Sequence, residues 1–212
     1  FLICAQGFLG WFMVESGLVD RVDVSHYRLA SHLCLAFVIL SITFWYILER
    51  YKINSFDKKL PSLLLIIIFI FIFFQIILGA FLAGLDGGLI YNTWPDMNGK
   101  FLPDDVSIAS FFSSESFNTP SIIQFIHRKM AYILFILILY LNIVYIYKKL
   151  PIINILVFDL AVLFQIFLGV ITLLSGAKIF YASLHQIGSI IVVSSFLYIC
   201  YKNINTNLQP SN

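Results

Sequence analysis

Five long stretches of the chain contain no Asp, Glu, Lys or Arg and consist almost entirely of apolar residues: 29–48, 60–85, 130–147, 160–177 and 179–201. Each is close to, or above, the roughly 20 residues that a helix needs to cross the hydrocarbon of a bilayer. Of the 212 residues, 60% are hydrophobic and only 11% are charged. A water-soluble core could not bury so much apolar surface, so we expect an all-α, polytopic membrane bundle with these five spans.

A sixth apolar run, residues 1–14, ends at Glu15 and would cover only about 21 Å as a helix. The run has no charged leader and does not start with methionine, which predicts that an upstream part is missing. The pattern Gln-x-Phe-Leu-Gly occurs at 6–10 and again at 165–169, each copy followed at the same spacing by Ser-Gly. Such a repeat indicates two pseudo-symmetric four-helix halves whose first two helices are missing. We expect 1–59 to be the rest of the N-terminal half, 60–202 the C-terminal half and 203–212 a cytoplasmic tail.

The distribution of Lys and Arg predicts the orientation in the membrane. The connections at 49–59 and 148–151 and the C-terminal tail together carry seven basic residues, whereas the longer connections on the other side carry six. The positive-inside rule therefore places the first set, with the C-terminus, in the cytoplasm. The basic residues are too scattered for a nucleic-acid surface, so no nucleic-acid partner is expected.

Three histidines, His32, His127 and His185, each lie near the start of a predicted span. In each case the residue four positions later is small: Ala36, Ala131 and Ser189. Positions i and i+4 share a helix face, so a flat macrocycle can lie against the helix while the imidazole reaches its iron. The three spans cross in the same direction, which puts all three histidines on one side of the membrane, by the charge distribution the periplasmic side.

Heme is therefore the expected ligand. No second Cys, carboxylate or His follows any of the three at the spacing that a tetrahedral zinc site requires. His127 and His185 belong to the same half and would supply a bis-imidazole heme, whereas His32 would face an upstream histidine around a second heme. We assign no ligand role to His26, which we place in the outer loop.

Other residues in these regions admit two interpretations each. Arg128 and Arg28 lie close to His127 and His32 in sequence, where they could contact heme propionates or anchor their helices at the interface. The aromatic-rich loop 91–99 could be a lid over one site or an interfacial anchor. The glycines Gly79, Gly84 and Gly169 are interpreted as points of close helix packing.

These residues resemble one family, the heme A synthases of the type shared by alphaproteobacteria and mitochondria. The resemblance covers most of the chain and is carried by the segments 10–18, 28–33, 84–88, 91–99, 127–132 and 184–186, which read Gly-Trp-Phe-Met-Val-Glu-Ser-Gly-Leu, Arg-Leu-Ala-Ser-His-Leu, Gly-Leu-Asp-Gly-Gly, Tyr-Asn-Thr-Trp-Pro-Asp-Met-Asn-Gly, His-Arg-Lys-Met-Ala-Tyr and Leu-His-Gln. Any one of these segments alone would be weak, but together they are specific.

The resemblance implies a membrane oxidoreductase that oxidises the methyl group at position 8 of heme O to the formyl group of heme A for cytochrome oxidase assembly, through two hydroxylations and a dehydration. It implies heme b as the cofactor, with His127 and His185 as iron ligands, and His32 as a ligand of the substrate heme. The family's catalytic glutamate would lie upstream of Phe1, and Gln124 holds the equivalent place before His127. We therefore assign no catalytic residue here and do not expect this chain alone to turn over.

The expected location is the cell inner membrane, or the mitochondrial inner membrane in a eukaryote. The expected partners are heme O, lipid, an electron donor, the heme O synthase and a second copy of the chain. Two other functions fit bis-histidine spans: a membrane cytochrome b that only transfers electrons, and a heme transporter or chaperone without redox chemistry.

Overall fold

The computed structural model describes residues 1–15 and 24–204, and within these ranges it contains helices and loops with one isolated β-bridge, between Met97 and Lys100. The α-helices are α1 (Leu2–Glu15), α2 (His26–Arg50), α3 (Ser62–Gly84), α4 (Pro120–Tyr147), α5 (Ile152–Leu174) and α6 (Ile179–Ile204). Three short 3₁₀ turns, η1 (Gly87–Leu89), η2 (Ile108–Phe112) and η3 (Ser116–Asn118), lie in the loop between α3 and α4. The Ser16-Gly17 end of the first repeat and residues 205–212 of the expected tail lie outside the described residues.

The five helices from α2 to α6 have 23 to 28 residues and are long and apolar enough to cross a membrane. This confirms the expected all-α, multi-pass membrane protein. Proline sets three of the helix starts: Pro61 and Pro151 precede α3 and α5, and Pro120 is the first residue of α4. Proline is favoured there because its missing N–H would have no partner in the first turn of a helix.

Two helices begin earlier than the uncharged runs indicated. The fourth helix begins at Pro120 rather than near 130, and α5 begins at Ile152 rather than at 160. The run ended in each case at charged residues, Lys129 and Asp159, which lie within the helices. His26 is also not in a loop, as expected, but is the buried first residue of α2. Its backbone lies against Gly84 of α3, where a Cβ would come within 2.7 Å of the His26 Cα.

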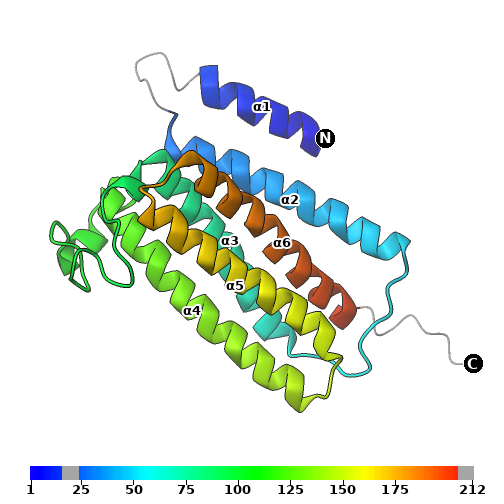
Figure 1. The fold of residues 1–212 in the computed structure, drawn as a ribbon. Helices are drawn as coiled ribbons and strands as arrows, with labels where there is room; N and C mark the ends of the chain where they lie inside the picture. Colours follow the sequence, from blue (N-terminus) through cyan, green and yellow to red (C-terminus); the bar gives the residue numbers. More distant parts are fainter. Residues whose placement is uncertain (16–23, 205–212) are drawn as a thin grey trace, which may run out of the picture.

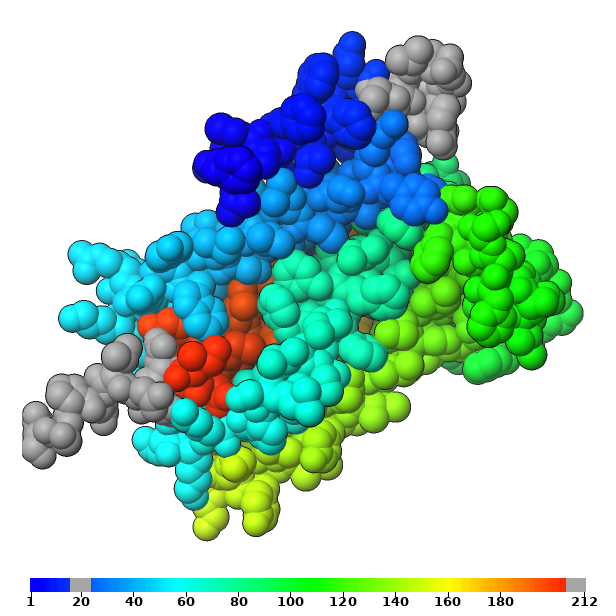
Figure 2. Space-filling view, turned by 180° about the vertical axis from the view of Figure 1, so that it is seen from behind, coloured from blue at the N-terminus to red at the C-terminus, as the bar shows by residue number. Residues whose placement is uncertain are grey.

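The helices α3 to α6 form an antiparallel bundle in which α3 packs on α4 and α5 packs on α6 (Figure 1). The helices α4 and α6 occupy diagonal positions, with α5 between them on the face seen in Figure 1 and α3 behind. The second helix packs against both α3 and α6, and α1 lies on the outer side of α2 (Figure 2). The division into 1–59 and 60–202 stays a prediction.

Most of the buried core lies toward one end of the bundle. A large cluster of buried side chains joins α2, α3, α4, α5 and α6 and includes Ile68, Leu141, Phe158 and Phe196. A second, smaller cluster lies nearer the long loop and comes from α2, α3 and α4. The histidine-bearing part of the bundle is therefore held by fewer buried apolar side chains than the opposite end.

Candidate functional site

The three histidines lie at the same level of the bundle. His32 is the seventh residue of α2, His127 the eighth of α4 and His185 the seventh of α6. These three helices begin at the end of the molecule where the long loop 86–119 lies (Figure 1). Because they run in the same direction, the shared register puts the three imidazoles at a common depth beneath that loop.

Each histidine is held by a glutamine on the helix that precedes it. The Gln6 Nε2 donates to the carbonyl oxygen of His32 at 3.1 Å, Gln75 Nε2 to that of His127 at 2.9 Å, and Gln165 Nε2 to that of His185 at 2.8 Å. Two of the amides also reach the ring: Gln6 Nε2 lies 3.3 Å from Nδ1 and 3.2 Å from Nε2 of His32, and Gln75 Nε2 lies 3.4 Å from Nε2 of His127.

A glycine four residues after each glutamine makes room for the imidazole. A Cβ built on Gly10 would lie 3.1 Å from Cε1 of His32, one on Gly79 3.5 Å from Cε1 of His127, and one on Gly169 3.0 Å from Cε1 of His185. Positions i and i+4 share a helix face, so the glutamine and the glycine meet the same histidine. We call each such set of Gln, Gly and facing His a histidine cradle. Gly79 and Gly169 were interpreted as points of helix packing, and the structure shows that the group packed against them is an imidazole.

The cradles fit a metal-bound imidazole. His127 and His185 each have a buried Nδ1 without a hydrogen-bond partner. A buried polar nitrogen without a partner is rare in proteins, and ligation of an external group is one explanation of it. Their helices lie diagonally across the bundle, and the two imidazoles are close enough for their charges to interact. Within residues 1–15 and 24–204, no three His, Cys, Asp or Glu side chains gather as a metal site of their own.

Arg128, expected beside a heme propionate or at the interface, binds the long loop instead of lying free. Its Nη1 donates to the carbonyl oxygens of Thr93 and Asp96, both at 2.8 Å, and its Nη2 donates to that of Tyr91 at 2.6 Å. Gln124, one turn earlier on α4, also donates to the Tyr91 carbonyl at 3.1 Å. The loop 91–97 is thereby attached to α4 directly beside His127, and a propionate contact of Arg128 stays a prediction.

A carboxylate fixes the other end of this loop. Asp105 accepts hydrogen bonds from the Tyr91 hydroxyl at 2.7 Å and from the Ser121 hydroxyl at the start of α4. Burial acts to raise the pKa of Asp105, but the hydrogen bonds from Ser121 and Tyr91 outweigh it, so the pKa lies below its usual value. The pKa of Tyr91 is raised, chiefly by its hydrogen bond to Asp105.

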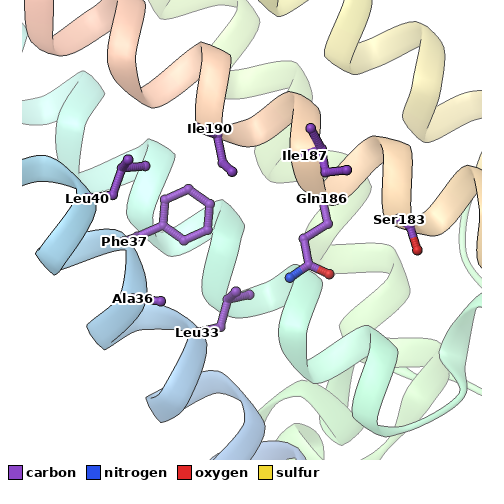
Figure 3. Close-up of a pocket in the computed structure, with 8 residues that line it drawn as sticks. All are labelled: Leu33, Ala36, Phe37, Leu40, Ser183, Gln186, Ile187 and Ile190. Carbon is purple, nitrogen blue, oxygen red and sulfur yellow. The ribbon is translucent and has the colours of Figure 1, made fainter. Parts of the chain in front are cut away.

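A groove of about 420 Å³ lies between α2 and α6, beside two of the histidines (Figure 3). Its walls are Leu33, Ala36, Phe37 and Leu40 from α2 and Ser183, Gln186, Ile187 and Ile190 from α6. Gln186 follows His185 in sequence, yet its side chain enters this groove. Arg28 lies one turn before His32 and stacks over the Phe12 ring of α1 at 5.0 Å, so its contact with a propionate also stays a prediction.

Sequence reasoning missed the middle cradle. The Gln-x-x-Leu-Gly pattern at 75–79 has the same form as those at 6–10 and 165–169, but it stands inside a uniformly apolar run. The long loop also separates it from His127 by more residues than in the other two cases. The signal that could have found it is the glutamine, the only strongly polar side chain between Ser62 and Asp86.

Comparison with known proteins gives the family. The model of the COX15-CtaA family, described as cytochrome oxidase assembly protein, matches residues 1–197. The chain belongs to this family. The match covers all three cradles of this family member and the loop between α3 and α4. No solved structure matches the chain.

Curated members of the COX15-CtaA family are similar over nearly all of this chain. A protein named Heme A synthase from Pelagibacter ubique is 58% identical over 205 residues, and those from Rickettsia felis and Rickettsia bellii are 41% and 39% identical over 213 residues. The alignments cover 97% of this chain but only 61% to 63% of these relatives. The chain therefore spans somewhat less than two thirds of their length.

Proposed function

We propose that this chain is the part of a heme A synthase that binds heme b and contributes one ligand to the substrate heme. The supporting observation is the threefold repetition of one arrangement, a histidine at a common depth set against a glutamine and a glycine of the preceding helix. The name Heme A synthase of the relative that is 58% identical supplies the reaction, oxidation of a methyl group of heme O to a formyl group.

His127 and His185 would hold heme b, and His32 would hold heme O. The diagonal positions of α4 and α6 support the first pair, because a planar group between them would meet one imidazole on each face. Heme b would supply electron transfer, and the protein would supply axial ligands, orientation and a surrounding of low polarity. The loop 91–97, attached through Arg128 and Gln124, would cover the histidine end of α4 and limit access of water.

The proposed orientation places the histidines on the periplasmic side and the end of α6 in the cytoplasm. This rests on the distribution of basic residues between the two sets of connections. The substrate heme O, the electron donor, contact with the heme O synthase and self-association belong to the proposal. Heme A synthesis by this chain alone is not expected, since no catalytic glutamate is assigned in it.

The test is expression of the complete reading frame that encodes this chain, in cells that make heme O but lack their own heme A synthase. Extracted pigments are separated by chromatography and identified by mass. Formyl heme in the extract supports the proposal. Unchanged heme O with a low-spin heme spectrum indicates an electron-transfer cytochrome b instead, and heme O that is bound and released without a redox spectrum indicates a transporter or chaperone.

A further inference from the structure

The three cradles share more than the position of their ligands. In each, one amide hydrogen of the glutamine goes to the carbonyl oxygen of the histidine itself, at 3.1, 2.9 and 2.8 Å. That bond fixes the amide group beside the imidazole of the same residue. A glutamine that merely joined two helices could bond any carbonyl along the facing helix, whereas all three bond the histidine.

Each cradle also leaves an acceptor without a donor. The Oε1 atoms of Gln6, Gln75 and Gln165 are all buried and have no hydrogen-bond partner. The Nδ1 atoms of His127 and His185 are likewise buried and without a partner. Buried polar atoms are nearly always paired, so the same vacancy in three separate helix pairs requires an explanation.

Metal ligation explains both sets of atoms together. An imidazole that binds iron through one ring nitrogen carries its proton on the other, and this N–H almost always donates to an oxygen acceptor of the protein. In the neutral, unligated ring the same proton can sit on either nitrogen, so the acceptor is not required. The spare amide oxygen of each glutamine is the acceptor that a ligated imidazole would need.

We infer that Gln75 and Gln165 are positioning residues for the axial histidines, with the amide oxygen accepting the ring N–H of His127 and His185, and that Gln6 does the same for His32. This inference rests on the proposed function, because it assigns the glutamines a role toward heme. Gly188 supports the assignment for Gln165, since a Cβ at Gly188 would collide with the Gln165 Oε1. The absence of a side chain there lets the amide oxygen approach α6.

The inference has a signed consequence. An acceptor on the ring N–H makes the imidazole a stronger electron donor, which favours ferric over ferrous iron and lowers the reduction potential. Gln75→Leu and Gln165→Leu therefore raise the midpoint potential of heme b, and Gln75→Glu lowers it. Loss of such a partner typically weakens metal binding by about 10- to 100-fold, and we expect a loss of heme affinity in this range for the leucine variants.

The experiment uses the protein from the complete reading frame, purified with its heme. Redox titration, the low-spin electron paramagnetic resonance signal and heme affinity are measured for Gln75→Leu, Gln165→Leu and Gln75→Glu. Gln186→Leu is the matched control, because it removes a glutamine adjacent to His185 whose side chain lies in the groove toward α2. Binding of added heme O by Gln6→Leu tests the cradle of His32.

The outcomes separate the inference from the proposed function. Opposite shifts of the potential in the leucine and glutamate variants, with none in Gln186→Leu, support the inference. Leucine variants whose potential and heme affinity equal those of Gln186→Leu overturn it, even if their thermal stability falls, because that result describes helix packing alone. If His127→Ala keeps the low-spin heme spectrum, the proposed function itself fails.

Discussion

The glycines that face the histidines differ in how closely they approach the ring, which gives a prediction at the scale of single residues. A Cβ on Gly169 would lie 3.0 Å from Cε1 and 3.4 Å from Nδ1 of His185, so the ring would have to move by a few tenths of an ångström. A Cβ on Gly79 would lie 3.5 Å from His127, an ordinary contact. We expect Gly169→Ala to alter the low-spin heme signal and lower heme affinity by about tenfold, and Gly79→Ala to leave both nearly unchanged.

The two variants control for each other. Replacing glycine by alanine inside a helix raises helix propensity by about 1 kcal/mol at either position, so both helices gain equally. A difference in the heme signal therefore reports the imidazole and not the stability of the helix. Equal signals from the two variants would show that the ring of His185 is not held by Gly169.

Sequence patterns predicted the histidines and two of the three glutamine patterns, but not what the patterns do. The repeat at 6–10 and 165–169 indicated duplication of a helix pair, yet only the structure shows the glutamine and glycine meeting a histidine. The contact could not be derived from one sequence, because it depends on the rotation of two helices about their axes. Arg128 is a similar case, since its partners are backbone carbonyls that carry no sequence signal.

At the scale of elements, the first turns of α4 and the loop before them form one unit. Tyr91, Asp105 and Ser121 are joined by hydrogen bonds, and Arg128 and Gln124 bind the Tyr91 carbonyl. The pKa of Asp105 is lowered in the folded protein, so its contribution to stability is complete above the usual pKa of Asp, about 3.9, and is lost as the pH falls below it. The pKa of Tyr91 is raised, so its contribution is complete below about 10 and is lost at higher pH.

We therefore predict that attachment of the loop is independent of pH between about 5 and 9. Protection factors of the amides in residues 91–106, measured by hydrogen exchange, should be constant in this range and fall below about pH 4. Asp105→Asn should lower them about fivefold at every pH, the equivalent of about 1 kcal/mol for hydrogen bonds of an exposed carboxylate. A steep fall in protection between pH 6 and 8 would contradict the role given to Asp105.

The helices themselves were predicted well, and their starts less well. Apolar runs located all five spans, because a helix in hydrocarbon must present apolar side chains on most of its surface. The runs placed the starts of α4 and α5 too late, since they end at charged residues such as Lys129 and Asp159 that the bundle accommodates. Lys129 lies over the Phe101 ring at 3.9 Å, and Asp159 accepts a hydrogen bond from Asn142 at 2.9 Å.

At the scale of the whole molecule, the common depth of the three histidines follows from topology alone. The helices α2, α4 and α6 run in one direction, and each carries its histidine seven or eight residues from its start. The sequence was sufficient for this prediction because the number of crossings between two residues fixes whether they lie on the same side. It was not sufficient for the diagonal placement of α4 and α6, which depends on how α3 and α5 pack between them.

The proposed pairing of His127 with His185 gives a prediction that distinguishes the two heme sites. His185→Ala removes one axial ligand of heme b, so the low-spin heme b spectrum of the complete protein should be lost. His32→Ala should leave that spectrum intact and abolish heme A formation, because His32 lies on α2 against Gln6 and Gly10 of α1. Absorbance and paramagnetic resonance spectra, with extracted pigments, measure both effects. Loss of the heme b spectrum in His32→Ala, with retention in His185→Ala, would assign the ligands the other way and require a heme between α2 and its neighbours.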